Sequence, residues 1–212
     1  VVKFARWGFE KFPGVEDKLG TQMRAVGEVM SIGKNYKEAL QKAIRSLEIN
    51  RYGLGFAKNF HEKPLEELLD LIASPTSERQ FLMYEALRKG ADIDLLHELT
   101  RIKPWFIQQM KQLVELEERI LENPGQVPAD DLLAEAKKDG FSDRYLAKIL
   151  GIEEFALRQR RKELNLAEAW DAVPVSGVKD ASYYYSTYNA KNTVPVSDRK
   201  KIMVLGGGPN RI

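Results

Sequence analysis

The sequence contains no cysteine and only two histidines, His61 and His97, in 212 residues. Without cysteine there is no disulfide framework, no thiol nucleophile and no thiolate-bound zinc. The two histidines lie 36 positions apart and do not match a metal-ligand spacing. The absence of cysteine fits a reducing compartment, and we expect the protein to be cytoplasmic.

The sequence also lacks a long apolar run and a strong excess of charge of one sign. No stretch approaches the roughly 18 apolar residues that span a bilayer, so we expect no membrane segment. Lys and Arg number 33 against 31 Asp and Glu, which gives a net charge of +2. A dedicated polyanion-binding protein usually carries a clustered basic face and a higher pI. Since 43% of the residues are hydrophobic, the chain can form a folded core of one or two domains.

Apolar residues recur at spacings of three and four over most of residues 36–166, which predicts a succession of amphipathic helices. Asn35 followed by Glu38 is typical of a helix N-terminus, and Pro64 and Pro104 stand where helices commonly begin. The predicted helices cover about 36–48, 64–72, 77–88, 95–99, 104–122, 129–138, 142–150 and 153–164, with ends at Gly90, Gly140 and Gly151.

These patterns divide the chain into four segments. Residues 34–170 form a helical domain, so the predicted fold class is mainly α, a multi-helix orthogonal bundle with short extended or strand edges. Residues 1–33 mix short apolar runs with glycines, and the resemblance described below implies that they are the edge of a preceding unit. Residues 171–200 are expected to be an extended connector laid over a neighbouring surface. Residues 201–212 are predicted to form a strand and a glycine loop. Because such a strand needs a following element to pack on, we expect the chain to be a piece of a longer polypeptide.

A glycine-rich loop near the end of the sequence is the first candidate for ligand binding. Glycine allows backbone N–H groups to approach a phosphate closely, and this loop comprises Gly206, Gly207, Gly208, Pro209 and Asn210. It has neither the Lys-Ser/Thr of a Walker loop nor the third glycine and helix of a dinucleotide-binding loop. A tight turn that binds no ligand is the interpretation we favour.

Two predicted helices around Gly151 raise the alternative of a nucleic-acid-binding helix-turn-helix in residues 141–166. Such a module needs basic side chains that reach phosphates and base edges. This segment holds six Lys and Arg against four Asp and Glu, and helix pairs joined by a glycine turn are common in bundles. We keep nucleic-acid binding as the alternative function and expect no nucleic-acid partner.

No residue pattern predicts a catalytic site or a metal site. Acidic residues in the helix 104–122 are interpreted as a solvated face with ion-pair spacings to Lys111 and Arg119. The aromatic block at residues 183–188 is interpreted as a docking segment on another domain, because no basic residues interleave it. The acidic residues of the helix 104–122 are Glu115, Glu117, Glu118 and Glu122.

Four residues of the helix 104–122 lie off its main apolar stripe: Trp105, Val114, Leu116 and Leu121. We expect these side chains to be exposed, and exposed apolar patches beyond a few hundred Å² usually mark an interface. The sequence therefore predicts self-association through this helix, as a homodimer, which is the commonest symmetric assembly.

Both ends of the sequence carry a resemblance to a known family. Residues 22–33 resemble the end of the first ATP-grasp unit in the large chain of carbamoyl-phosphate synthetase. Residues 185–188 and 201–212 resemble the entry to the second, duplicated half of that chain. Between them, residues 101–107 and 113–118 resemble the helical linker of the same family, so the resemblance covers essentially the whole sequence.

The resemblance implies a helical oligomerisation domain between two ATP-using halves. It implies a parent ATP-dependent ligase that makes carbamoyl phosphate from bicarbonate, glutamine-derived ammonia and two ATP, for arginine and pyrimidine synthesis. It further implies magnesium and potassium at the nucleotide sites and a small glutaminase chain as partner. The nucleotide-binding residues of that family lie outside residues 1–212, so we expect this chain alone to hold no cofactor, to be inactive, and to contact the rest of the large chain.

Overall fold

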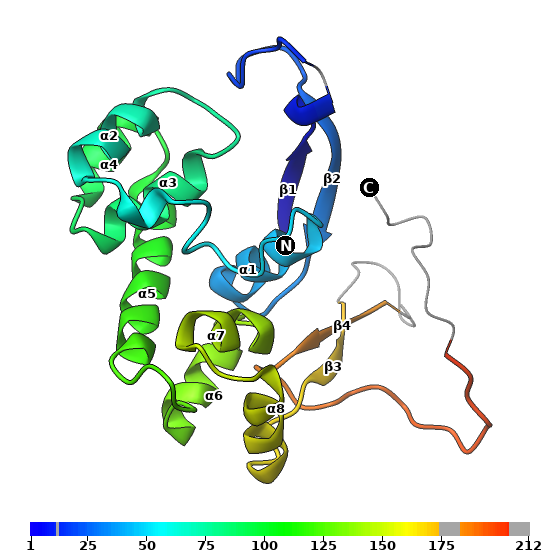
Figure 1. Cartoon of the computed structure of the whole chain (residues 1–212). Coiled ribbons are helices and arrows are strands. Elements are labelled where there is room, and N and C mark those ends of the chain that lie inside the picture. Colours follow the sequence, from blue (N-terminus) through cyan, green and yellow to red (C-terminus); the bar gives the residue numbers. More distant parts are fainter. Residues whose placement is uncertain (12, 174–182, 204–212) are drawn as a thin grey trace.

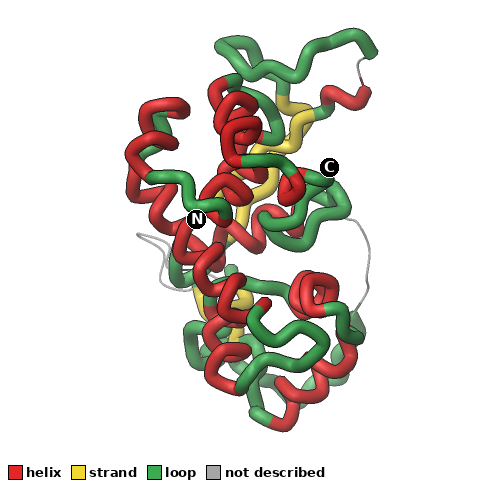
Figure 2. The backbone as a smooth tube through the Cα atoms, turned by 60° about the vertical axis from the view of Figure 1, so that its left-hand side comes forward, coloured by secondary structure: helices red, strands yellow, loops and turns green. Residues whose placement is uncertain are grey.

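The computed structural model describes residues 1–11, 13–173 and 183–203. Within these ranges the chain forms eight α-helices and two small sheets, which confirms the predicted mainly α fold (Figure 1). Figure 2 shows the same dominance of helix, with strands confined to two places. The helices are α1 (Tyr36–Ser46), α2 (Leu65–Ala73), α3 (Arg79–Arg88), α4 (Ile93–Thr100), α5 (Pro104–Leu121), α6 (Asp130–Lys138), α7 (Asp143–Leu150) and α8 (Glu154–Glu163).

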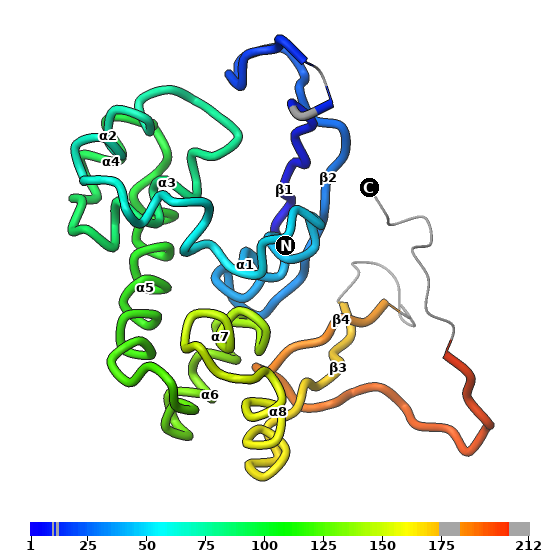
Figure 3. Tube along the Cα trace, in the orientation of Figure 1, coloured from blue at the N-terminus to red at the C-terminus, as the bar shows by residue number. Residues whose placement is uncertain are grey.

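Each sheet is a pair of antiparallel strands. Strand β1 (Val2–Trp7) pairs with β2 (Ala25–Ser31), and this pair packs against α1. Phe4 and Val29 face each other across the ladder, and both are buried. Strand β3 (Ala169–Ala172) pairs with β4 (Tyr184–Thr187), so part of the predicted connector is a regular strand pair. Figure 3 shows β4 returning beside β3 and α8.

Helix α1 begins where the sequence predicts it. The Asn35 side chain accepts a hydrogen bond from the Glu38 N–H (2.8 Å), and the Glu38 carboxylate accepts one from the Lys34 N–H (2.9 Å). The predicted helix ends at Gly140 and Gly151 are also confirmed, with φ of +91° and +69°. A Cβ at Gly140 would lie 2.9 Å from the Glu38 Cα. Only glycine therefore lets the turn between α6 and α7 pack directly on α1.

Two helix starts differ from the prediction by two residues each. Helix α3 begins at Arg79 because the Asp17 carboxylate holds Ser77 outside the helix, accepting from its hydroxyl and from its N–H (2.9 Å). Helix α4 begins at Ile93 because the Asp92 side chain caps it by accepting from the N–H groups of the first turn. The first of these constraints comes from a residue 60 positions away.

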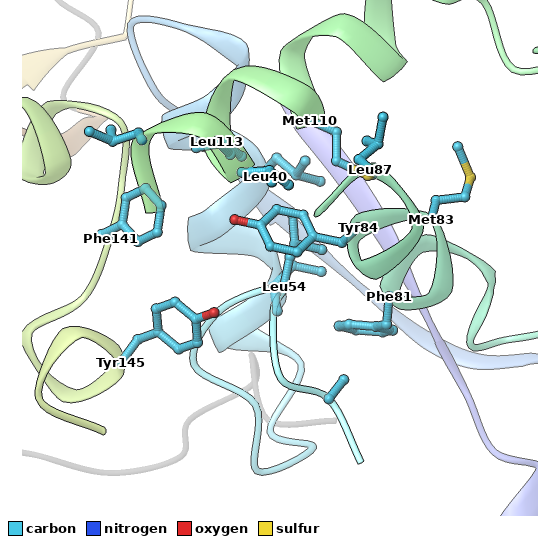
Figure 4. Packing of buried hydrophobic residues seen from close by; sticks show 14 of the residues in the cluster. Leu40, Leu54, Phe81, Met83, Tyr84, Leu87, Met110, Leu113, Phe141 and Tyr145 are labelled. Atoms are coloured by element: carbon cyan, nitrogen blue, oxygen red, sulfur yellow. The ribbon is translucent and has the colours of Figure 1, made fainter. Parts of the chain in front are cut away.

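A single apolar core lies between the helices and takes in α1, α3, α5 and α7 (Figure 4). Its largest side chains include Phe81, Tyr84, Phe141 and Leu40, each at most 1% exposed. Figure 4 shows the hydroxyls of Tyr84 and Tyr145 directed toward each other across this core. Two buried hydroxyls of this kind need an acceptor, because an unsatisfied buried donor is costly.

The acceptor is the carboxylate of Glu117, which is 0% exposed. Tyr84 donates to Glu117 Oε2 at 2.8 Å, Tyr145 donates to the same oxygen at 2.9 Å, and Arg88 donates to Oε1. The prediction of a solvated acidic face is therefore wrong for Glu117, because α3 and α7 cover that side of α5. It is confirmed for the other three carboxylates, Glu115, Glu118 and Glu122, which are exposed.

The charges in this buried network compensate one another. Burial raises the pKa of Glu117, while the Arg88 guanidinium and the two tyrosine hydroxyls oppose that rise. Burial alone would lower the pKa of Arg88, but the carboxylates of Glu117 and Glu85 raise it. Burial also raises the pKa values of Tyr84 and Tyr145 well above the ordinary value of a tyrosine hydroxyl. The network is thus a hydrogen-bonded set of donors and acceptors, with Arg88 shared by the Glu117 and Glu85 carboxylates, that links α3, α5 and α7.

The same network fixes the loop between α1 and α2. The Phe56 N–H donates to the buried Glu85 carboxylate, and the Arg88 guanidinium lies 4.5 Å from the centre of the Phe56 ring. A Cβ at Gly55 would lie 2.5 Å from the Tyr145 hydroxyl and 2.6 Å from Glu117 Oε1, so only glycine fits there. Positive φ values at four non-glycine residues show how closely the loop is constrained: Glu48, Asn50, Phe56 and Lys58.

We expect Glu117→Gln to lower the free energy of unfolding by about 3 kcal/mol, because it removes the charge that faces buried Arg88. Urea unfolding followed by circular dichroism measures this loss. The matched control is Glu115→Gln, an exposed position on the same helix, which should change stability by less than about 0.5 kcal/mol. Equal stability of the two variants would contradict the role assigned to the network.

A second ion-paired group joins α6, α7 and α8. Asp143 accepts from the Lys137 ammonium at 2.7 Å and from the Arg161 guanidinium at 2.9 Å. Lys137 also donates to the Phe141 carbonyl at 2.7 Å. Burial alone would raise the pKa of Asp143, but Lys137 and Arg161 hold it below its ordinary value.

This lowered pKa predicts a pH-dependent contribution to stability. The Asp143 carboxylate stabilises the fold fully above its unfolded pKa of about 3.9, and the contribution is lost as the pH falls through the lower folded value. The difference in free energy of unfolding between the wild type and Asp143→Asn should therefore be largest near pH 7 and shrink below about pH 4. Urea titrations at several pH values measure it. A difference that stays constant down to pH 2 would refute this assignment.

Candidate self-association surface

The exposed large apolar side chains of α5 lie in its first turn and not in its middle. Trp105 is 55% exposed and Phe106 is 39% exposed. They meet Tyr36, the first residue of α1, with ring centroids 5.3 Å apart for Tyr36–Trp105 and 5.2 Å apart for Tyr36–Phe106. The Trp105 and Phe106 centroids lie 5.0 Å apart. We call these three residues the aromatic cluster.

The local sequence explains why the cluster is at a helix end. Pro104 is the first residue of α5, where its missing N–H costs no helical hydrogen bond. Lys103 before it is extended, and Arg101 closes α4 in the left-handed conformation with φ of 61°. The chain thus turns sharply from α4 into α5, and the first two side chains after Pro104 are left partly exposed.

An apolar hollow of about 230 Å³ lies beside the cluster. Burial raises the pKa of the Tyr36 hydroxyl, whose ring forms one wall. The side-chain oxygen Oε1 of Gln80 is buried and has no hydrogen-bond partner in the described part of the chain. The surface can therefore accept apolar groups. Its lining residues are Tyr36, Gln80, Met83, Ile102, Phe106, Ile107 and Met110.

The four residues predicted to form the contact do not lie together on the surface. Trp105 is exposed as expected, and Leu121 is half-buried. The expected exposure is wrong for Val114 and Leu116, which are 4% and 2% exposed. The physical reason is that α1, α3 and α7 all pack on α5, so its covered side is wider than one apolar stripe. Tyr36 and Phe106 were not among the predicted contact residues, although Phe106 directly follows Trp105.

The structure treats the other expectations from the sequence, for a glycine loop, a metal site and a membrane span, in different ways. The loop Gly206, Gly207, Gly208, Pro209 and Asn210 lies outside the described residues, as does most of the strand predicted before it. Among the described residues, no group of three or more His, Asp and Glu side chains is arranged to hold a metal ion. None of the helices in the described ranges is long and apolar enough to cross a bilayer.

The helices α7 and α8 do form the predicted pair around Gly151. Two of their basic residues are held by carboxylates within the chain. Arg160 pairs with Asp130 at 2.7 Å and with Glu163 at 2.7 Å, while Arg161 pairs with Asp143. These two guanidiniums are therefore not available for the phosphate contacts that the nucleic-acid alternative needs.

Comparison with known proteins decides the family. A family model described as the carbamoyl-phosphate synthetase large chain, oligomerisation domain, matches residues 28–165. The chain belongs to this oligomerisation-domain family. The resemblance to this family that the sequence suggested is thereby confirmed over residues 28–165. Nothing in the comparisons supports a helix-turn-helix protein.

Relatives of the oligomerisation-domain chain are large chains of carbamoyl phosphate synthase. The one from Archaeoglobus fulgidus is 43% identical over 100% of this chain and 20% of the relative. Those from Thermotoga maritima and a Nostoc species are 42% and 39% identical over 100% of this chain, covering 19% and 20% of the relatives. The chain thus spans about a fifth of the length of the curated relatives it matches.

The burial of α5 predicts that two alanine substitutions on this helix lower the free energy of unfolding by different amounts. Leu116→Ala should lower the free energy of unfolding by about 2–5 kcal/mol, because it leaves a cavity in the core. Trp105→Ala should cost less than about 1 kcal/mol, because most of that side chain already contacts solvent. Urea unfolding of both variants tests this. A larger loss at Trp105 than at Leu116 would show that the assignment of core and surface is wrong.

Proposed function

We propose that this chain is the self-association module of a carbamoyl phosphate synthase large chain, and that the aromatic cluster forms part of the contact between two copies. The observation that carries the proposal is the cluster itself. Three aromatic rings from α1 and α5 lie together, Trp105 and Phe106 are exposed, and Tyr36 and Phe106 also line an apolar hollow. Aromatic side chains of this kind are enriched at the centres of protein interfaces.

A symmetric dimer is the simplest assembly that covers the cluster. In an isologous contact each copy presents the same patch, so Trp105 of one copy can enter the hollow beside Phe106 of the other. Burial of the indole would supply much of the binding free energy, while its N–H still needs an acceptor.

We further propose the activity of the longer protein from the resemblance and from the names of the relatives. The parent enzyme would make carbamoyl phosphate from bicarbonate, glutamine-derived ammonia and two ATP, with magnesium and potassium at its nucleotide sites. Its partners would be the rest of the large chain and a small glutaminase chain, in the cytoplasm. This chain would hold no cofactor and supply no catalytic residue; its part would be to bring large chains together.

Static light scattering over a hundredfold dilution tests self-association. We expect a defined dimer that dissociates on dilution, and at least tenfold weaker association in Trp105→Glu, because the substitution places a charge in the contact. The matched control is Phe155→Glu on α8, since Phe155 is 62% exposed and lies outside the cluster. Both variants should keep the helical circular dichroism spectrum.

A monomer at every concentration up to about 100 μM would reject the proposal, because a dimer with a free energy of association near −8 kcal/mol would be visible there. A series of sizes without a plateau would indicate nonspecific adhesion and would also reject it. Equal weakening by Trp105→Glu and Phe155→Glu would place the contact away from the cluster.

A further inference from the structure

A second hollow, of about 250 Å³, lies where α1, the α6–α8 region and β4 meet. Figure 1 shows the β3–β4 pair beside α8 at this end of the molecule. Six basic and four acidic side chains line the hollow. We call it the basic hollow after its cationic residues: Lys42, Arg45, Lys137, Arg144, Arg158 and Arg161.

Two of these cations are held by carbonyl oxygens instead of carboxylates. The Lys42 ammonium donates to the Ile32 carbonyl at 2.5 Å and to the Ser186 carbonyl at 2.7 Å. The Arg45 guanidinium donates to the Gly140 carbonyl at 2.7 Å. Within the described ranges, neither cation lies within 4.0 Å of a carboxylate oxygen. Removing such charges from water without an adjacent counter-charge is unfavourable, and the more distant carboxylates of Glu38 and Glu168 offset this cost only in part.

Burial lowers the pKa of Lys42 and of Arg45, which reflects this loss of solvent. The two side chains are three residues apart on α1 and therefore project from the same face of that helix. Both line the basic hollow and are half-buried. The geometry thus places two partly desolvated cations side by side in the lining of a cavity that is open to solvent.

None of the four lining carboxylates forms an ion pair with Lys42 or Arg45, although Glu38 and Glu168 oppose the lowering of both pKa values from a longer distance. Asp143 is already shared by Lys137 and Arg161. Glu38 accepts from the Lys34 N–H and from the Asn189 amide. The remaining two, Glu154 and Glu168, belong to exposed residues.

We propose that the basic hollow binds a small oxyanion of the phosphate class, either free phosphate or a phosphate monoester. Arg45 presents a planar guanidinium whose N–H groups match two phosphate oxygens, and Lys42 supplies a second positive charge. Arg158 is exposed at the edge of the hollow and has no hydrogen bond or ion pair in the described part of the chain. It is therefore available to cover the bound ion.

The position of the hollow gives binding a structural consequence. Lys42 on α1 already contacts β4 through the Ser186 carbonyl, across 144 positions of sequence. An anion held by Lys42, Arg45 and Arg158 would connect α1, α8 and β4 through one ligand. Occupancy should therefore stabilise the attachment of the β3–β4 pair to the helices.

Isothermal titration with inorganic phosphate tests the site, with chloride keeping the ionic strength constant. We expect saturable one-to-one binding with a dissociation constant near or below about 1 mM. Arg158→Ala should weaken it at least tenfold. The matched control is Arg160→Ala, two residues along the same helix, because Arg160 pairs with Asp130 and Glu163 and does not line the hollow. Its affinity for phosphate should equal that of the wild type.

A second variant, Arg45→Met, should abolish phosphate binding if its circular dichroism spectrum shows that it folds. If it does not fold, the comparison of Arg158→Ala with Arg160→Ala decides.

A parallel titration with glycerol phosphate identifies the source of the ligand, since binding of both compounds indicates a monoester site and binding of phosphate alone indicates a site for the free ion. Absence of saturable phosphate binding up to about 20 mM, or equal weakening in Arg158→Ala and Arg160→Ala, would overturn the proposal. The outcome is independent of self-association, because the hollow and the aromatic cluster share no residue.

Discussion

The buried carboxylate of Glu117 is the constraint on which the arrangement of the helices depends. A carboxyl group at 0% exposure needs hydrogen-bond donors, and the donors to Glu117 come from Tyr84 and Arg88 on α3 and from Tyr145 on α7. Three helices are therefore held in one relative position by one side chain. Because Gly55 lies against the same carboxylate without room for a Cβ, the loop before α2 is fixed as well. This rigid body is what presents the first turn of α5 to solvent.

Local signals predicted the helices well and their contacts poorly. The pairing of Asn35 with Glu38 and the glycine at position 140 act within one turn of helix, so the sequence reveals them. The start of α3 was missed because Asp17 holds Ser77 across 60 positions. The β3–β4 pair was missed because each strand has only four residues, too few for periodicity to separate a strand from an irregular segment.

The candidate site shows the same division between local and distant information. The position of Trp105 beside Pro104 is a local feature, and its exposure follows from the helix start. Glu117 is buried by partners 28 and 33 positions away along the chain, and Leu116 is buried because other helices pack on α5. The spacing within α5 reveals neither. The basic hollow has no sequence motif, because its lining residues come from α1, α8, β4 and the segments between them, which lie far apart in the sequence.

Native-state hydrogen exchange at the Phe56 amide tests the central constraint most directly. This N–H lies in a loop without regular secondary structure, yet it donates to the buried Glu85 carboxylate beside Arg88. If the Glu117 network fixes the loop, the Phe56 amide should exchange only through global unfolding, with the same protection as the Leu113 amide in the buried part of α5. Exchange of the Phe56 amide at the rate of an open loop, while Leu113 stays protected, would contradict the account.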